Sequence, residues 1–81
     1  MNKRKEVIKL EVNIEELKTL IKDEYRDNQS WFASDIGINS SYLNEILNLR
    51  KSSKSNKLCI AIIKFCEKRK IDYRKYIIFL E

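Results

Sequence analysis

Five short polar side chains recur on the outward face of a helix predicted near the middle of the 81-residue chain: Ser40, Ser41, Asn44, Glu45 and Asn48. An asparagine amide can pair with adenine through two hydrogen bonds, serine can donate or accept, and glutamate can accept from the cytosine amino group. Glu45 could equally exclude wrong sites by repelling phosphate. These residue types predict contacts with the base edges of duplex DNA. Because the helix carries no arginine, a guanine-dominated readout is less expected.

The residues around this helix suit contacts with the DNA backbone. Ser40 and Ser41 also present the N–H groups and the positive dipole end of the helix N-terminus. The following segment, Leu49–Asn56, is predicted to be a basic loop. One interpretation is that its basic side chains, together with the hydroxyls of Ser52 and Ser53, hold phosphates on either side of the groove. The other is that the loop is flexible and solvated. Phosphate contacts give affinity and register but no sequence information. The predicted backbone contacts are Gln29, Asn39, Tyr42, Arg50, Lys51 and Lys54.

The elements that must position these side chains lie within residues 29–48, QSWFASDIGINSSYLNEILN. The pattern predicts a helix from about Ser30 to Ile36 and a second helix that is capped by Asn39 and ends near Leu47. Gly37, the only glycine of the chain, can adopt the positive φ that the turn between them needs. The expected inner face consists of Phe32, Ala33, Ile36, Ile38, Leu43, Ile46 and Leu47. An ordinary helical hairpin needs only apolar spacing, whereas here a small alanine, a glycine, an apolar residue and a polar cap follow in register.

At these residues the chain resembles the Cro and phage-repressor family of helix-turn-helix proteins, also called the xenobiotic-response-element type. The family pattern has glutamine first, an apolar residue fourth, alanine fifth, an apolar residue eighth and glycine ninth, with apolar residues at the tenth, fifteenth and eighteenth places. This chain has Gln29, Phe32, Ala33, Ile36, Gly37, Ile38, Leu43 and Ile46 at those places. The resemblance extends more loosely over residues 13–76 and covers neither the N-terminal strand nor the last residues.

The resemblance implies sequence-specific binding of operator DNA, usually by a dimer and usually for repression. Gln29 matches the family position that contacts the DNA backbone and braces the recognition helix. We therefore expect a transcriptional regulator of the phage or mobile-element type, with the helix at about residues 40–47 in the major groove and a dimer on an inverted-repeat operator. The alternative is a protein-binding module on the same scaffold, such as an antitoxin or an inhibitor of a nucleic-acid enzyme.

The remaining segments predict a single, mainly α domain (residues 1–81), a compact bundle of four to five helices with a possible two-stranded β element. A helix capped by Asn13 is expected to end near Arg26. Another, capped by Ser55 or Asn56, covers Lys57–Lys70. The stripe expected to be buried on the first of these helices is Ile14, Leu17, Ile21 and Tyr25, and on the second Leu58, Ala61, Ile62, Phe65 and Cys66.

The two ends of the chain predict β structure. Ile8–Val12 alternates apolar and charged residues as a strand does, and it could pair with Tyr76–Leu80 or across a dimer. Asp72 can cap a helical turn over Tyr73–Tyr76, and the segment after it could be a strand or more helix. The basic tail Met1–Lys5 could touch DNA or be solvated. Trp31 either covers the core or lies against the sugar-phosphate backbone.

The helix Lys57–Lys70 is apolar on two sides, which a short chain cannot fully cover. Ile60 and Ile63 fall off its core stripe. They could lie under the terminal strands or form a dimer interface with the C-terminal segment. The expected homodimer contact is Ile60, Ile63, Ile77 and Phe79.

Composition narrows the function. The net charge of +5 and the pI of about 9.3 suit a polyanionic partner. The sequence has no histidine, no metal-ligand spacing, no glycine-rich phosphate loop and no nucleophile beside a base, so we expect no enzyme, cofactor, metal or small-molecule ligand. Cys59 and Cys66 would lie roughly 10 Å apart on a helix, too far for a disulfide. With no signal peptide or membrane span visible, we expect a cytoplasmic protein with buried thiols.

Overall fold

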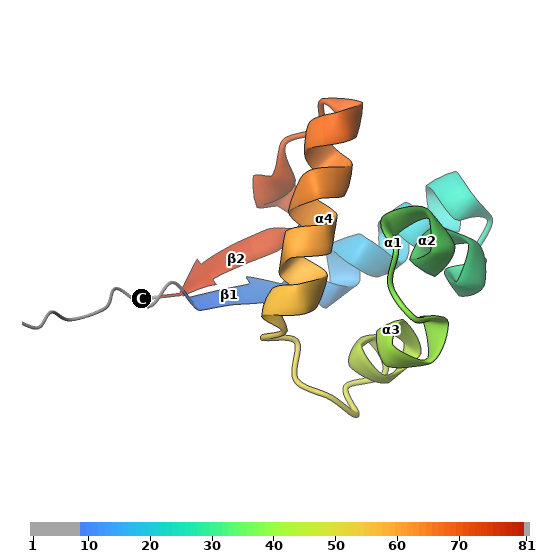
Figure 1. Cartoon of the computed structure of the whole chain (residues 1–81), viewed down its shortest axis with the longest axis horizontal. Coiled ribbons are helices and arrows are strands. Elements are labelled where there is room, and N and C mark those ends of the chain that lie inside the picture. The colour runs from blue at the N-terminus through green and yellow to red at the C-terminus, as the bar shows by residue number, and fades with distance from the viewer. Residues whose placement is uncertain (1–8, 81) are drawn as a thin grey trace, which may run out of the picture.

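The computed structural model describes residues 9–80, so the basic tail Met1–Lys5 and the predicted strand residue Ile8 lie outside the described residues. The elements are β1 (Lys9–Val12), α1 (Ile14–Tyr25), α2 (Gln29–Ile36), α3 (Ser40–Leu47), α4 (Asn56–Arg69), the 3-10 turn η1 (Tyr73–Lys75) and β2 (Ile77–Leu80). The predicted fold class is confirmed: the protein is mainly helical, with a small sheet formed by its N- and C-terminal strands (Figure 1). Within this part of the chain, no helix has the length and apolar character needed to cross a membrane.

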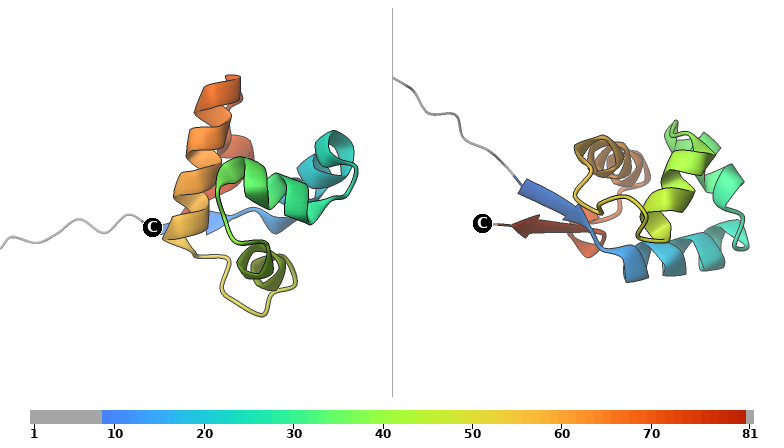
Figure 2. Two further views of the ribbon diagram at one scale, coloured as in Figure 1. Left: turned by 45° about the vertical axis from the view of Figure 1, so that its right-hand side comes forward. Right: turned by 90° about the horizontal axis from the view of Figure 1, so that it is seen from below.

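Strands β1 and β2 pair with each other, which decides between the two pairings that the sequence left open. They are antiparallel, with Leu10 opposite Phe79 and Val12 opposite Ile77. A two-stranded ribbon is marginally stable alone, and this one gains support because its inner end supplies Val12 and Ile77 to the core. The outer end projects away from α1, α2 and α3 (Figure 2). The ribbon therefore extends from the side of the molecule that α2 and α3 do not occupy.

Each of the four α-helices in residues 9–80 begins at a polar cap whose side chain accepts a hydrogen bond from the first turn. The caps are Asn13, Asn28, Asn39 and Ser55. Asn28 accepts from the Trp31 backbone N–H at 2.9 Å, so α2 begins at Gln29, one residue before the predicted start. Gly37 ends α2 with a φ of 74°, in agreement with the predicted turn. The helical boundaries thus follow mainly from local side-chain hydrogen bonds.

The core is one cluster to which all four helices and both strands contribute. Most of the residues predicted to face inward are buried there, and Cys59 and Cys66 are buried free thiols as expected. The exceptions are few: Ile14, Ile36 and Ala61 are only partly buried. Leu20, which was not expected in the core, is also buried there.

The four residues predicted for a dimer contact do not share one environment. Ile60 and Phe79 are 49% and 50% exposed, and Ile63 is half-buried. Ile77 is only 2% exposed, so its assignment to an interface is wrong. The physical reason is its place at the inner end of the ribbon, where it faces the core. The next residue, Ile78, is 41% exposed and is the isoleucine that this strand leaves accessible.

Candidate nucleic-acid interface

An open polar depression of about 420 Å³ lies between the start of α2 and the outward face of α3. Its lining residues come from three elements that the turn at Gly37 and the bend after α3 bring together: Gln29, Ser30, Ser40, Ser41, Asn44, Glu45 and Arg50. All of these except Ser30 are residues that the sequence predicted as DNA contacts. Ser30 was not predicted as a contact; it is the second residue of α2 and is exposed.

A direct hydrogen bond joins the two helices at this depression. The Asn44 side-chain amide donates to the Gln29 side-chain oxygen at 2.9 Å. Both groups are near the surface, and the bond uses one of the two N–H donors of Asn44 and one lone pair of Gln29. The remaining amide groups are available to an external partner. Asn44 is thereby held in one orientation, with a donor and an acceptor still unused.

The N-terminus of α3 is organised by Asn39. Its side-chain oxygen accepts from the backbone N–H of Ser41 at 2.8 Å and from that of Tyr42 at 3.1 Å. Only its NH₂ group is left for the phosphate contact that the sequence predicted. Ser40 and Ser41, the first two residues of α3, are both exposed at this helix end. An anionic or polar ligand would meet these hydroxyls together with the positive end of the helix dipole.

Asn48 is not brought together with the other predicted base contacts. It lies at the C-terminal cap of α3, outside the residues that line the depression. Its side-chain amide donates to the Asn44 carbonyl at 3.0 Å, and the same carbonyl also accepts from the Asn48 backbone N–H at 3.0 Å. The sequence placed it on the outward face correctly, since it is exposed, but could not show that its side chain serves the helix end.

Two predicted contact residues pair with each other. The Lys51 ammonium lies 3.7 Å from the Glu45 carboxylate, and both side chains are about half exposed. The backbone also tightens here, because the N–H groups of Arg50 and Lys51 both donate to the Glu45 carbonyl, at 2.7 and 3.2 Å. An exposed ion pair of this kind contributes about 0 to 1 kcal/mol. It can therefore be exchanged for a phosphate at little cost.

Tyr42 connects α3 to the start of α4. Its hydroxyl shares a hydrogen bond with the Ser55 hydroxyl, which also caps α4 by accepting from the Leu58 N–H at 3.2 Å. The Lys57 ammonium lies 5.4 Å from the centre of the Tyr42 ring, within cation–π range. The sequence did not single out Lys57 as a phosphate contact. Lys57 is the second residue of α4 and lies beside Tyr42, so it adds a positive charge next to the basic loop.

The loop between α3 and α4 is joined to β1 by two hydrogen bonds that both involve Ser53. The Val12 N–H donates to the Ser53 carbonyl at 2.8 Å, and the Ser53 hydroxyl donates to the Glu11 carboxylate at 2.7 Å. Ser52 accepts from the Lys54 backbone N–H at 3.0 Å. Ser53 is therefore committed to the strand rather than to phosphate. Lys54 is exposed in the same loop.

Trp31 packs on the domain, as one of the two roles that the sequence left open requires, and it also keeps an exposed face. Its ring meets the Tyr25 ring edge to face, with centroids 4.8 Å apart, and it remains 50% exposed. One part of the indole therefore packs on the domain, while the other part is accessible two residues from Gln29. It is also the only tryptophan of the chain.

A long-range cluster behind α2 fixes the orientation of that helix. The Tyr25 hydroxyl on α1 donates to the Asp35 carboxylate on α2. Arg69 on α4 donates to the same carboxylate at 3.1 Å and to the Tyr25 hydroxyl at 3.2 Å. Burial, reinforced by the hydrogen bond to Asp35, raises the pKa of Tyr25 to about 12. Since three helices meet here, this cluster is positioned to resist rotation of α2 relative to the core.

No family model, no curated protein and no solved structure matches this chain. The resemblance to helix-turn-helix repressors stays a prediction from the motif residues. Among residues 9–80, no group of three or more His, Cys, Asp or Glu residues could hold a metal ion.

Proposed function

We propose that the chain is a sequence-specific double-stranded DNA-binding transcriptional regulator, in which α3 enters the major groove. The observation that carries this proposal is the depression where Gln29 of α2 holds Asn44 of α3 at 2.9 Å. The major groove is about 12 Å wide and admits one helix, and its base edges offer donors and acceptors to short amide and hydroxyl side chains. Short side chains of this kind are present at three exposed positions of α3: Ser40, Ser41 and Asn44.

The affinity in this proposal comes largely from phosphate contacts. Arg50 lines the depression, and Lys54 is exposed in the loop that follows it. Lys51 and Lys57 flank Tyr42 at 6.0 and 5.4 Å from its ring centre. Because each neutralised phosphate releases counterions, binding should weaken steeply as salt rises.

We further propose that the active unit is a homodimer on an inverted-repeat operator, and that its effect is repression of the phage or mobile-element type. Exposed Ile60, Ile78 and Phe79 offer apolar surface for such a contact. Two copies would present their α3 helices about 34 Å apart, one turn of DNA. In this proposal the chain works in the cytoplasm without catalytic activity, cofactor or small-molecule ligand.

The first experiment is a selection of random-sequence duplex DNA with the full chain, followed by footprinting of the enriched sites. We expect an inverted repeat with half-sites about one helical turn apart. Enrichment of a single, unrepeated site would overturn the dimer but keep the DNA-binding role. No enrichment at all would overturn sequence-specific binding.

The second experiment assigns the reading residues. The double variant Ser41→Ala/Asn44→Ala should lose about 2 to 4 kcal/mol of specific binding and keep its weak nonspecific binding, because single mismatched contacts cost about 1 to 3 kcal/mol. The matched control is Thr19→Ala/Ser34→Ala, two exposed polar residues outside the depression. Unchanged operator affinity in the first variant would remove these residues from the site.

A protein-binding module is the second candidate, and one observation favours it. Ile60, Ile78 and Phe79 are large apolar residues that are all more than 40% exposed. An antitoxin or enzyme inhibitor would use one of these exposed apolar positions for its partner rather than for a second copy. A monomeric chain that enriches no DNA sequence would favour this candidate.

A further inference from the structure

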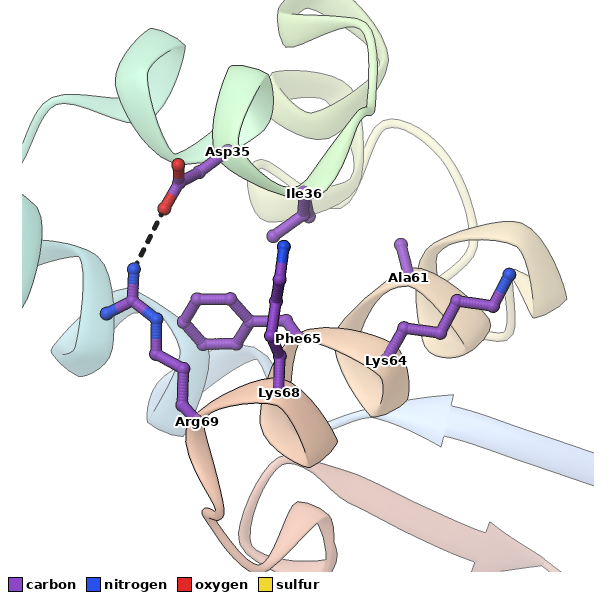
Figure 3. Close-up of a pocket in the computed structure, with 7 residues that line it drawn as sticks. All are labelled: Asp35, Ile36, Ala61, Lys64, Phe65, Lys68 and Arg69. Carbon is purple, nitrogen blue, oxygen red and sulfur yellow. Dashed lines mark hydrogen bonds and ion pairs between the residues drawn. The ribbon is translucent and has the colours of Figure 1, made fainter.

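A second hollow lies between the C-terminal end of α2 and the exposed side of α4 (Figure 3). It has a volume of about 430 Å³. The residues that line it are Asp35, Ile36, Ala61, Lys64, Phe65, Lys68 and Arg69. It shares no lining residue with the polar depression on α3. We refer to it as the α2/α4 groove.

The floor of the α2/α4 groove is apolar. Phe65 closes it toward the core and is 6% exposed, while Ile36 and Ala61 are only partly buried. The sequence predicted both Ile36 and Ala61 as inward-facing, and the structure leaves carbon surface of each open within a concave site. Such surface gains free energy when a ligand removes it from water. This floor distinguishes the groove from an ordinary charged helix face.

The rim of the groove is basic. Lys64 and Lys68 lie one turn apart on α4, and Figure 3 shows Lys68 extending from α4 toward Ile36. Among residues 9–80 neither lysine forms an ion pair, whereas Arg69 is held by Asp35 at 3.1 Å. Like charges four residues apart repel each other and weaken a helix. An anion between Lys64 and Lys68 would remove this repulsion.

We propose that the α2/α4 groove binds an acidic, amphipathic segment of a protein partner. Apolar side chains of the segment would cover Ile36, Ala61 and Phe65, and a carboxylate would lie between Lys64 and Lys68. A DNA backbone fits this site poorly, because its phosphates offer no apolar group to the floor formed by Ile36, Ala61 and Phe65. The Asp35 carboxylate at one end of the groove is paired with Arg69. The proposal goes beyond DNA binding, since it assigns the regulator a protein partner on a surface separate from α3.

The size of the groove sets the scale of the interaction. Its volume is at the low end of ligand sites, so it holds a few side chains of a short segment rather than a folded domain. Short grooves that anchor one face of an amphipathic helix take residues spaced three or four apart. We therefore expect the segment to place its carboxylates one helical turn apart, beside leucine, isoleucine or phenylalanine.

The test uses the full chain as bait for a displayed library of random fourteen-residue peptides. We expect enriched peptides that combine acidic and large apolar residues at helical spacing. Lys64→Glu/Lys68→Glu should weaken their binding by about tenfold or more, because rim charges of the wrong sign repel the segment. The matched control is Lys18→Glu/Lys22→Glu, which makes the same charge change at the same spacing on exposed positions of α1. Enriched peptides without acidic bias, or equal loss in both variants, would overturn the proposal.

Two further measurements exclude other occupants. Operator or nonspecific DNA affinity should be the same in both double variants; a larger loss in Lys64→Glu/Lys68→Glu would mean that the groove faces DNA and would overturn the proposal. Sedimentation equilibrium should give the same self-association for both variants; weaker association of the α4 variant alone would identify a second copy as the occupant and likewise overturn it. Because all four positions are exposed, circular dichroism should show unchanged folding.

Discussion

The side-chain oxygen of Gln29, the first residue of α2, accepts a 2.9 Å hydrogen bond from the amide of Asn44 on α3. The two residues are fifteen positions apart and meet only because Gly37 turns the chain through a left-handed conformation. The bond holds a proposed base-reading side chain before any DNA arrives. Preorganisation of this kind reduces the entropy lost on binding.

The Gln29–Asn44 bond should appear as coupling in a double-mutant cycle on operator affinity. Gln29→Ala and Asn44→Ala should each weaken binding, and the double variant should lose less than their sum by about 1 kcal/mol, the usual net value of one hydrogen bond. The control cycle pairs Gln29→Ala with Ser41→Ala, which also lines the depression but makes no side-chain bond to Gln29 in the described structure. Additive losses in the first cycle would show that the bond does not position Asn44.

Local chemistry made much of this architecture predictable. Caps at Asn13 and Asn39 and the glycine turn depend on residues within a few positions of each other, so their sequence signals are direct. The pairing of the terminal strands was one of two open alternatives, because alternation identifies a strand but not its partner. Ile77 was assigned to the wrong environment for a related reason: a shift of one residue moves a strand side chain to the other face.

The long-range parts of the site were not predictable from the sequence. Tyr25, Asp35 and Arg69 are up to 44 positions apart, and no local pattern indicates that they share a hydrogen-bonded cluster. The same holds for Ser53, whose bond to Glu11 spans 42 positions and joins a polar loop to β1. Such contacts depend on how the packed helices bring distant segments together.

Gly37 provides a test of the turn itself. A Cβ added at this residue would meet nothing within 4 Å, so a substitution costs backbone strain rather than a clash. Gly37→Ala should lower the free energy of unfolding by about 1 kcal/mol, because an L-residue is disfavoured at a φ of 74°. Gly37→Asn should cost less, since asparagine tolerates this conformation. Urea unfolding measures both, and equal stability of Gly37→Ala and the native chain would contradict the assigned turn.

Ile77 and Phe79 should separate folding from self-association. Ile77→Ala opens a cavity in the core and should destabilise the chain by about 2 to 4 kcal/mol. Phe79→Ala, at a half-exposed position, should change the stability of the dilute chain by less than about 1 kcal/mol. If Phe79 lies in the proposed dimer contact, its replacement should raise the dimer dissociation constant measured by sedimentation equilibrium. An equal stability loss in both variants would contradict the burial difference.

Tyr25 predicts an alkaline limit to stability. Its pKa is raised to about 12 in the folded chain, from an ordinary value of 10.0, so the folded state holds the hydroxyl proton more tightly than the unfolded state. This contribution is complete below pH 10 and is lost as the pH rises toward 12, and it amounts to about 3 kcal/mol at most. Tyr25→Phe should therefore show a flatter decline of unfolding free energy between pH 9.5 and 11, measured by urea titration. Parallel declines would show that Tyr25 does not titrate with unfolding.

Glu45 should set the balance between specific and nonspecific binding. Its carboxylate lies 3.7 Å from the Lys51 ammonium. It also lines the polar depression on α3, which in the proposed complex faces the major groove of the DNA. Glu45→Gln removes one charge that repels phosphate and releases Lys51 to bind one. The salt dependence of nonspecific binding should then steepen by about 0.9 in the slope of log K against log salt, the increment for one more phosphate contact.

The specific complex should respond differently to Glu45→Gln. If the carboxylate accepts from a cytosine amino group, the variant gains a phosphate contact but weakens that base contact, so operator affinity rises less than nonspecific affinity and the specificity ratio falls. Glu24→Gln on α1 makes the same charge change at an exposed position outside the depression. Screening over about 8 Å at physiological salt should leave its DNA affinity nearly unchanged. An unchanged salt slope in Glu45→Gln would show that Lys51 does not reach phosphate, and an unchanged specificity ratio would limit Glu45 to electrostatic repulsion.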